Sequence, residues 1–366
     1  MVKICHLSTV HQRVDVRIVH KECKSLAQAG YDTHLIIADG LADELWNGIT
    51  IHGLPMHSAR LIRMLLSPLQ ILFKAIRVDA RVYHFHDAEL IFCALVLRCM
   101  GKSVIYDVHD NLPLQIMGKH YIHISLRQIM AAGVRTLESL FSPMMTAIVT
   151  ADRNKEARFK HYHRLVRTVH NYPILEELEL IDSSKRQPKT ICYVGGITKI
   201  RGIMQLLDAI VDLDVKLILA GAFEPKALES EARAHPGWIK VDYRGFQDRQ
   251  GIAGVLSESS VGMVTLLPNE NYLDSLPIKM FEYMSAAMPV IASDFEQWRQ
   301  IVDRYDCGIC VDPLHPGLIA SAIKELLEDP LRAQQMGLRG REGIVTDLNW
   351  STQAEILKAL YKEILS

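Results

Sequence analysis

The stretch PILEELELIDSSKRQPKTICYVGG, from Pro173 to Gly196, decides how the chain is organised. Its first part, residues 173–190, is polar and holds a proline near each end, which is typical of a linker. Its last part is a short apolar strand that ends in two glycines and is similar in character to the first strand of the chain, VKICHLS. The pattern of the first half therefore restarts after the linker.

Short apolar strands alternate with amphipathic helices on both sides of this linker. VYHFHD and SVIYDVHD are strands of the first half, and VKLILAG and VGMVTLL are strands of the second. This alternation is typical of an α/β fold with parallel sheets flanked by helices. We predict a Rossmann-like domain over residues 1–172, the linker over 173–190, a second Rossmann-like domain over 191–348, and a terminal helix over 349–366 that crosses back to the first domain. Two such domains predict a cleft at the carboxyl ends of their strands.

Composition limits the classes of function. The chain has 366 residues, 49% of them apolar, and a formal net charge of -1, so it offers no overall field that would attract nucleic acid. The N-terminus begins a strand and lacks the features of a signal peptide. No run of about 18 uncharged apolar residues predicts a membrane span. With seven cysteines, an odd number set mostly in apolar runs, we expect reduced thiols and a cytoplasmic protein.

The stretch NYLDSLPIKMFEYMSAAMPVIASD, residues 271–294, places two acids eight residues apart in an apolar segment. Pro277 fits the first turn of a helix, and Ser275 is then the expected N-cap. A helix N-terminus favours an anion such as phosphate. The acids, Asp274 and Glu282, are either a cap and an exposed helix carboxylate or partners for the hydroxyls of a ligand, and the spacing alone leaves both open.

A glycine turn with basic residues follows the first strand of the second domain. The segment VGGITKIRG contains Gly195, Gly196, Lys199 and Arg201. Such a segment is an ordinary connection between strand and helix in many α/β folds. Alternatively it holds a phosphate, since arginine grips phosphate through two parallel hydrogen bonds.

Two segments of the first half end apolar strands with histidine and aspartate. His109 follows the strand SVIYDV, and His86 with Asp87 follows VYHF. A lone histidine is more often a surface or satisfied residue than a catalytic one, but the carboxyl end of a strand is where ligands bind. We expect Asp87 to cap the helix that follows.

The first loop, STVHQRVDVRIVHKE, carries His11, Arg13, Asp15 and Arg17 before a helix. A dinucleotide-binding loop at this place is rich in glycine, and this loop has none, which argues against an NAD-dependent oxidoreductase. The loop either faces an acceptor or a phosphate, or is a solvated loop with a helix cap.

Taken together, these segments resemble retaining glycosyltransferase family 4, whose members have the GT-B fold. The acid at 274, the glutamate seven residues further on and PVIASD resemble the family's E-x7-E segment, and YVGGITKIRGI, VYHFHD and VIYDVHD match in the expected order. The resemblance covers nearly the whole chain. It departs at position 274, where aspartate replaces the usual glutamate, and at Gly196, where the family usually has arginine.

The resemblance implies a role for each of these residues. It places Glu282 on the ribose hydroxyls of the donor and Asp274 and His109 on the donor sugar. It places the donor diphosphate on Arg201, on Lys199 in place of the missing arginine, and on the amides from Leu276 to Ile278 after Ser275. It places Phe246 near the base, and His86 and the first loop on the acceptor side.

The implied activity is transfer of a sugar from a UDP-sugar or GDP-sugar to a hydroxyl acceptor, with the anomeric configuration retained. The acceptor expected from the resemblance is a lipid-linked glycan in the assembly of a bacterial surface polysaccharide. No metal is expected, because DLD at 212–214 ends a helix away from the carboxyl ends of the strands. The alternatives are another enzyme of nucleotide-sugars, such as an epimerase or hydrolase, and a two-lobed binding protein without catalysis.

Residues 56–81 hold five basic residues and a row of leucines. On a helix Arg60 and Arg63 share one face, and Lys74, Arg77 and Arg81 also share one. The residues that fall largely opposite are Leu61, Leu65, Leu69, Leu72 and Ile76. A basic amphipathic helix can lie on an anionic membrane, but any helix of a globular domain also has a polar and an apolar face. Peripheral attachment to the inner face of the cytoplasmic membrane is thus one expectation and a solvated basic face is the other.

Overall fold

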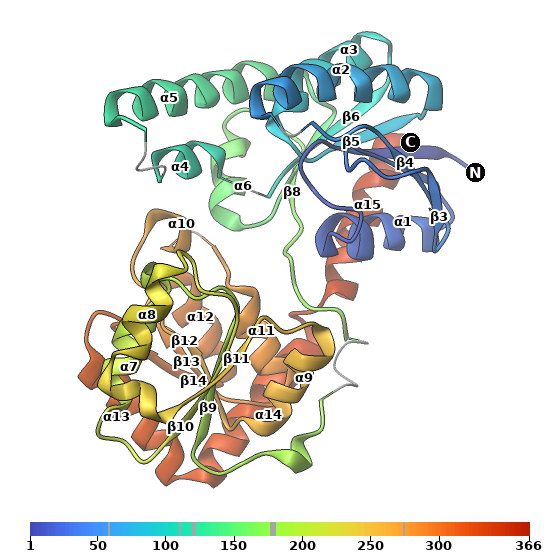
Figure 1. The fold of residues 1–366 in the computed structure, drawn as a ribbon. Helices are drawn as coiled ribbons and strands as arrows, with labels where there is room; N and C mark the ends of the chain where they lie inside the picture. The colour runs from blue at the N-terminus through green and yellow to red at the C-terminus, as the bar shows by residue number, and fades with distance from the viewer. Residues whose placement is uncertain (58, 110, 119–121, 176–180, 274) are drawn as a thin grey trace. The chain divides into compact units, whose positions relative to one another are not determined.

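The computed structural model describes residues 1–57, 59–109, 111–118, 122–175, 181–273 and 275–366. The chain forms two compact units. Unit 1 combines Met1–Asn171 with Trp350–Ser366, and unit 2 is Tyr172–Asn349. Figure 1 shows that each unit has a sheet with helices on its faces.

Unit 1 is built on an eight-stranded sheet in the order β3-β4-β2-β1-β5-β6-β7-β8. Neighbouring strands pair in parallel except β3, which runs antiparallel to β4. The strands are β1 (Lys3–Ser8), β2 (Asp32–Ile37), β3 (Glu44–Trp46), β4 (Ile49–Gly53), β5 (Val82–Phe85), β6 (Ser103–Val108), β7 (Ala147–Thr150) and β8 (Val166–Thr168). The chain order reverses at β1, which lies between β2 and β5, and ligands of open α/β sheets bind at such a point.

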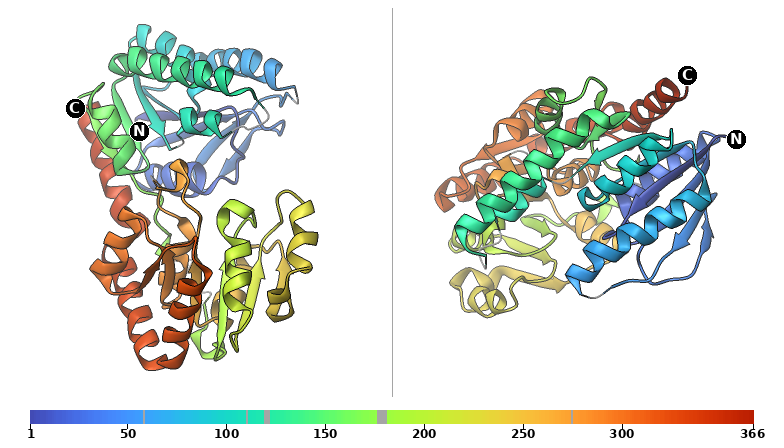
Figure 2. Two further views of the ribbon diagram at one scale, coloured as in Figure 1. Left: turned by 90° about the vertical axis from the view of Figure 1, so that its left-hand side faces the viewer. Right: turned by 90° about the horizontal axis from the view of Figure 1, so that it is seen from above.

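Helices cover both faces of this sheet. They are η1 (Val16–Cys23, a π-helical segment), α1 (Lys24–Gln28), α2 (Arg60–Val78), η2 (Ala88–Leu90), α3 (Ile91–Cys99), α4 (Leu112–Met117), α5 (Ile124–Phe141), η3 (Ser142–Met144), α6 (Arg153–Lys160) and α15 (Trp350–Leu365). Figures 1 and 2 show α2, α3 and α5 on one side of the sheet, and α1 and α15 on the other. The C-terminal helix α15 is held in unit 1 by Trp350, whose Nε1 donates to Ser25 Oγ at 2.8 Å.

Unit 2 has a six-stranded parallel sheet in the order β11-β10-β9-β12-β13-β14. The strands are β9 (Thr190–Val194), β10 (Lys216–Ala220), β11 (Val241–Gly245), β12 (Val261–Val264), β13 (Val290–Ser293) and β14 (Gly308–Val311). The chain order reverses between β9 and β12, so the carboxyl end of β9 is the expected ligand position of this sheet.

The core of unit 2 lies on both faces of its sheet. Ile191 and Tyr193 of β9 face one apolar cluster and Cys192 and Val194 face the other, as expected for a strand that is buried on both sides. The helices are η5 (Ser183–Lys185), η6 (Lys199–Arg201), α7 (Ile203–Ile210), α8 (Ala227–Arg233), η7 (Pro236–Lys240), α9 (Arg249–Glu258), α10 (Glu270–Leu273), α11 (Ile278–Ser285), α12 (Glu296–Tyr305), α13 (Pro316–Glu328) and α14 (Pro330–Thr346).

Candidate functional site

The glycine turn after β9 forms the centre of the candidate site in unit 2. Gly195 has a φ of +111°, a conformation that other residues rarely adopt. Arg201 reaches back across the turn, and its Nη1 donates to the carbonyl oxygen of Gly196 at 3.1 Å. A Cβ at Gly196 would lie 2.7 Å from this Nη1, so a side chain there would require the guanidinium to shift. The sequence motif thus positions a cation over a turn that has no side chains.

Lys279 brings a second cation to the same turn. Its Nζ lies 3.6 Å from the centre of the Tyr193 ring, and a Cβ on Gly195 would lie 3.5 Å from it. Nζ is buried and finds no hydrogen-bond partner among the described residues. Burial, together with the neighbouring positive charge of Arg201, lowers the pKa of Lys279 well below its ordinary value.

The structure places Lys199 away from this turn and Lys279 beside it. Lys199 points to the surface of unit 2, where its Nζ pairs with Glu231 at 2.7 Å. Lys279 was not among the predicted site residues, although a single lysine in the otherwise apolar start of α11 was a signal for it. Among the described residues, no carboxylate pairs with Arg201 or Lys279.

The start of α11 differs from the prediction. The helix begins at Ile278 with Pro277 in the cap position, and no side chain caps it. The prediction that Ser275 is the N-cap is therefore wrong. The chain at Ser275 is instead held through its carbonyl oxygen, which accepts a hydrogen bond from Trp298 Nε1 at 2.7 Å. Leu276 and Pro277 are half-buried beside this contact, and Asp274 lies outside the described residues.

Glu282 lies on the second turn of α11 and is paired across to α9. Its Oε1 accepts a hydrogen bond from Arg249 Nη1 at 2.7 Å, and its side chain is only 20% exposed. Phe246, in the loop between β11 and α9, is 81% exposed. A carboxylate and an exposed aromatic ring on the segments that flank α9 are groups that can contact a nucleoside.

The first loop of unit 1 is held by internal contacts. Arg13 pairs with Asp39 at 2.6 Å, and Asp15 caps η1 through a hydrogen bond from Ile18 N at 2.8 Å. Arg17 is buried, and it donates to both oxygens of Asp107 at 3.0 Å. These three residues thus have structural partners in unit 1.

His11 and His109 are brought together at the carboxyl ends of β1 and β6. Their Nε2 atoms lie 3.2 Å apart, and His109 Nδ1 lies 3.5 Å from Asp107 Oδ2. Both rings are only half-buried. They therefore present imidazoles at the strand ends where ligands of parallel sheets bind.

Asp87 does not have the predicted role of a helix cap. Its side chain accepts hydrogen bonds from Ser8 Oγ at 2.8 Å and from Thr9 N at 2.7 Å, and it makes no capping bond. Burial alone would raise the pKa of this carboxyl, but hydrogen bonds from His11, Thr9 and Ser8 lower it to about 2. The capping prediction failed because the loop after β1 offers closer donors than the helix.

The long helix α2 has an apolar stripe that faces outward. Leu65 is 69% exposed and Phe73 is 64% exposed, whereas Ile71 and Ala75 are buried against the sheet. The exposed apolar residues of α2 are Ile62, Met64, Leu65, Leu66, Leu69, Phe73 and Ile76. Those of α3 and α5 are Phe92, Val96, Ile124, Leu126, Ile129, Met130, Leu137 and Leu140. We call these residues the apolar face of unit 1. Among the described helices, none has the length and apolar character that crossing a bilayer requires.

Comparison with known proteins was made by sequence and by structure. Residues 177–343 match the family model described as glycosyl transferases group 1. D-rhamnosyltransferase WbpZ of Pseudomonas aeruginosa is 23% identical over 333 residues, which cover 88% of this chain and 84% of that protein. Alpha-D-kanosaminyltransferase of Streptomyces kanamyceticus is 25% identical over 186 residues, which cover 48% of this chain and only 45% of that protein.

Solved structures match over the whole chain. Sucrose-phosphate synthase from Thermosynechococcus elongatus aligns with a TM-score of 0.80 at 17% identity and covers 100% of this chain and 99% of that one. HepE from Anabaena in complex with UDP-glucose aligns with a TM-score of 0.74 at 13% identity, over 99% of this chain and 100% of that one. At these identities the likeness establishes the fold, which is that of GT-B enzymes.

Proposed function

We propose that this chain, whose residues 177–343 match the family model of glycosyl transferases group 1 and whose fold is that of GT-B enzymes, moves a sugar from a nucleoside diphosphate sugar to a hydroxyl acceptor with retained configuration. One observation carries the proposal. The glycine turn after β9 holds two basic side chains, Arg201 and Lys279, that form no salt bridge with a described carboxylate. Two basic groups beside a turn without side chains fit the diphosphate of a nucleotide-sugar, whose negative charge favours the protonated form of Lys279.

The remaining donor contacts are placed around this turn. We assign Glu282 to the ribose hydroxyls, because Arg249 holds its Oε1 and fixes its orientation. The exposed ring of Phe246 is assigned to the base. Lys279 takes the phosphate role considered for Lys199, whose ammonium is neutralised by Glu231. The backbone N–H groups of Leu276 and Ile278 at the start of α11 add donors for the phosphates, whereas Pro277 between them has none.

The chemistry follows from where charge develops. As the bond to the anomeric carbon breaks, negative charge grows on the leaving diphosphate, and Arg201 and Lys279 stabilise it more in the transition state than in the ground state. Asp274 and His109 are assigned to the sugar, where positive charge develops. The leaving phosphate takes the proton of the acceptor hydroxyl. No step of this scheme requires a metal ion.

The proposed acceptor is a lipid-linked glycan of a bacterial surface polysaccharide. The similarity over most of the chain to a D-rhamnosyltransferase of Pseudomonas aeruginosa supports sugar transfer, and the lipid-linked acceptor is the one that the family resemblance implies. The UDP and UDP-glucose complexes of HepE support a uridine diphosphate sugar as the first donor to test.

Product analysis separates this proposal from the alternative of an epimerase or hydrolase. The purified chain is incubated with UDP-sugars and GDP-sugars, with and without a glycan acceptor, and the products are resolved by chromatography. We expect release of nucleoside diphosphate that rises strongly when acceptor is added. Sustained conversion of the donor to its epimer or to free sugar, unaffected by acceptor, contradicts the transferase and favours the alternative.

We also propose that the apolar face of unit 1 docks on an anionic membrane. A globular protein rarely leaves so many large apolar side chains exposed on adjacent helices. Arg77 on α2 is exposed and supplies positive charge on the helix that carries much of the face. Apolar side chains with basic neighbours fit the interface of an anionic bilayer.

Vesicle flotation tests this docking. Wild-type chain is expected to bind vesicles that contain phosphatidylglycerol, and the double variant L65N/L69N is expected to bind at least about tenfold more weakly, because each buried leucine contributes about 1.5–3 kcal/mol. The matched control is Leu318→Asn, which removes a leucine exposed on α13 of unit 2. Equal binding by L65N/L69N and wild type, or no binding of wild type to anionic vesicles, contradicts the proposal.

A further inference from the structure

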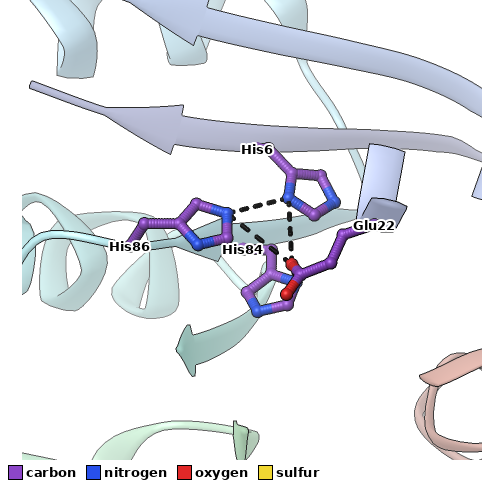
Figure 3. Close-up of side chains that lie close together, drawn as sticks. All are labelled: His6, Glu22, His84 and His86. Atoms are coloured by element: carbon purple, nitrogen blue, oxygen red, sulfur yellow. Dashed lines mark hydrogen bonds and ion pairs between the residues drawn. The ribbon is translucent and has the colours of Figure 1, made fainter. Parts of the chain in front are cut away.

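A second cluster of chemistry-bearing side chains lies inside unit 1, and the proposed reaction does not use it. His6 comes from β1, Glu22 from η1, His84 from β5, and His86 from the residue after β5. Because β1 and β5 pair in parallel with His6 opposite His84, the three imidazoles meet at one point of the sheet. His6, Glu22 and His84 are completely buried and His86 nearly so. Figure 3 shows the three rings gathered around the Glu22 carboxylate.

The nitrogen and oxygen atoms of this cluster are spaced as ligands of one ion would be. His6 Nδ1 lies 2.9 Å from His86 Nε2, and Glu22 Oε2 lies 3.9 Å from His6 Nδ1 and 4.0 Å from His86 Nε2. His84 Nδ1 also lies 4.0 Å from Glu22 Oε2. Four ligands at about 2.0–2.2 Å from a tetrahedral zinc ion lie about 3.4 Å from one another. The four observed separations, 2.9 Å and 3.9–4.0 Å, fall on both sides of about 3.4 Å. Small shifts of the side chains would therefore bring the four ligand atoms around one ion.

Charge in this buried region is unbalanced. Glu22 and Asp107 are both buried, and Arg17 contacts both: its Nε lies 3.2 Å from Glu22 Oε1 and its Nη2 lies 3.0 Å from Asp107 Oδ1. Within the described part of the chain, neither oxygen of Glu22 accepts a hydrogen bond. One guanidinium balances one of the two carboxylates, and a buried unbalanced charge is costly. A cation held between Glu22 and the imidazoles removes this imbalance.

The hydrogen bonds of the histidines bear on which ring nitrogens face the cluster. His86 Nδ1 lies 3.0 Å from Asp107 Oδ2, which favours the proton on Nδ1 and leaves the lone pair of Nε2 facing the cluster. The hydroxyl of buried Tyr361 on α15 lies 3.0 Å from His84 Nδ1 and 3.3 Å from His6 Nε2, and His6 Nδ1 is hydrogen-bonded to His86 Nε2, so a bound ion would displace the proton between these two rings and the Tyr361 contact of His84. A carboxylate behind a metal-binding histidine is the usual second contact in zinc sites.

We propose that His6, Glu22, His84 and His86 bind one divalent transition-metal ion, with zinc the ion that this ligand set fits best. Three imidazoles and one carboxylate suit zinc in tetrahedral coordination. The ion would join β1, η1 and β5 and would act on the stability of unit 1. This inference is independent of the proposed function, which assigns no metal to the reaction. The competing occupant is a proton on Glu22, whose pKa is raised by burial and by Asp107.

Metal analysis of the full chain tests the proposal. The cluster is closed to solvent, so the chain is produced in zinc-supplemented medium and its metal content is measured as isolated by mass spectrometry. It is then unfolded with a chelator and refolded with and without Zn²⁺ or Co²⁺. We expect one ion per chain, a melting temperature that falls when the ion is removed, and the visible absorption of tetrahedral Co²⁺.

Glu22→Gln keeps the size of the side chain and removes its charge. We expect this variant to bind the ion at least about tenfold more weakly, a loss typical of disturbed zinc sites. The matched control is His52→Gln, because His34 and His52 form another stacked histidine pair in unit 1, with Nδ1 and Nε2 3.0 Å apart. Its metal content should equal that of wild type.

Two results overturn the proposal. The first is a wild-type chain that contains no stoichiometric metal after zinc supplementation and has the same melting temperature with and without chelator. That result would mean that a proton on Glu22, and no metal ion, balances the charge. The other is a metal content that His52→Gln lowers as much as Glu22→Gln does. The metal content and melting temperature of the wild-type chain test the proposal even if Glu22→Gln does not fold.

Discussion

Replacing Lys279 by alanine is expected to lower kcat/KM for the nucleotide-sugar by about 10²–10³-fold, which is the loss typical when one preorganised electrostatic donor is removed. The ammonium is buried beside Gly195 and finds no partner among the described residues, so its charge is available to a bound diphosphate. Because charge on the leaving diphosphate grows in the transition state, kcat should fall more than substrate affinity. Steady-state kinetics of Lys279→Ala and Arg201→Ala measure both quantities.

Lys199→Ala is the matched control for this prediction. Lys199 lies on the same segment as Arg201, but its ammonium is exposed and paired with Glu231. Its loss should change kcat/KM less than about threefold, since exposed ion pairs contribute about 0–1 kcal/mol. A larger loss in Lys199→Ala than in Lys279→Ala would return the phosphate role to Lys199 and refute the assignment made from the structure.

Replacing Glu282 by alanine is expected to weaken the binding of the nucleoside diphosphate by about 10–100-fold. Hydrogen bonds to a charged group contribute about 1.5–3 kcal/mol, and the carboxylate is assigned to two ribose hydroxyls. The variant also leaves Arg249 without its partner at 2.7 Å. Calorimetric titration of UDP and GDP into wild type and variant measures the two dissociation constants.

Glu258→Ala is the matched control for Glu282→Ala. Glu258 also lies in unit 2 and is also paired with an arginine, since its Oε2 accepts from Arg244 Nη2 at 2.7 Å. It is not part of the proposed site, so its removal should leave the dissociation constant unchanged. The ribose assignment fails if both variants lose the same affinity, or if Glu282→Ala binds as tightly as wild type.

Much of the architecture follows from local sequence. The strand TICYV is apolar at every position because β9 is buried on both faces, and its glycines mark the turn where Gly195 takes a positive φ. Strands of this kind, repeated between amphipathic helices, predict parallel sheets with little ambiguity. The glycine turn and Arg201 are both visible in the sequence, and the structure places the arginine over the turn.

The failures have a common physical origin. Ser275 and Asp87 have side chains suited to capping, but tertiary contacts place them otherwise. Trp298 holds the carbonyl oxygen of Ser275, and the loop after β1 donates to the Asp87 carboxylate. The proximity of Lys279 to Gly195 depends on how α11 packs against β9. Sequence spacing carries no information on contacts made between elements far apart in the chain.

The histidine cluster is a second set of contacts that sequence spacing does not predict. His6 and His84 are 78 positions apart, and only the parallel register of β1 and β5 places them opposite each other. The fourth residue, Glu22, comes from η1, which also carries Arg17 toward the sheet. No motif of fixed spacing predicts such a set of ligands.

An assay of sugar transfer from a labelled nucleotide-sugar tests directly whether the chain is a retaining glycosyltransferase. Wild type is incubated with the donor and a glycan acceptor, and the configuration of the new bond is determined by NMR. We expect one nucleoside diphosphate to be released for each sugar transferred, with retained anomeric configuration. The double variant R201A/K279A should neither release nucleoside diphosphate nor transfer sugar. A folded wild-type protein that transfers no sugar from any UDP-sugar or GDP-sugar, or a double variant as active as wild type, would contradict the proposed function.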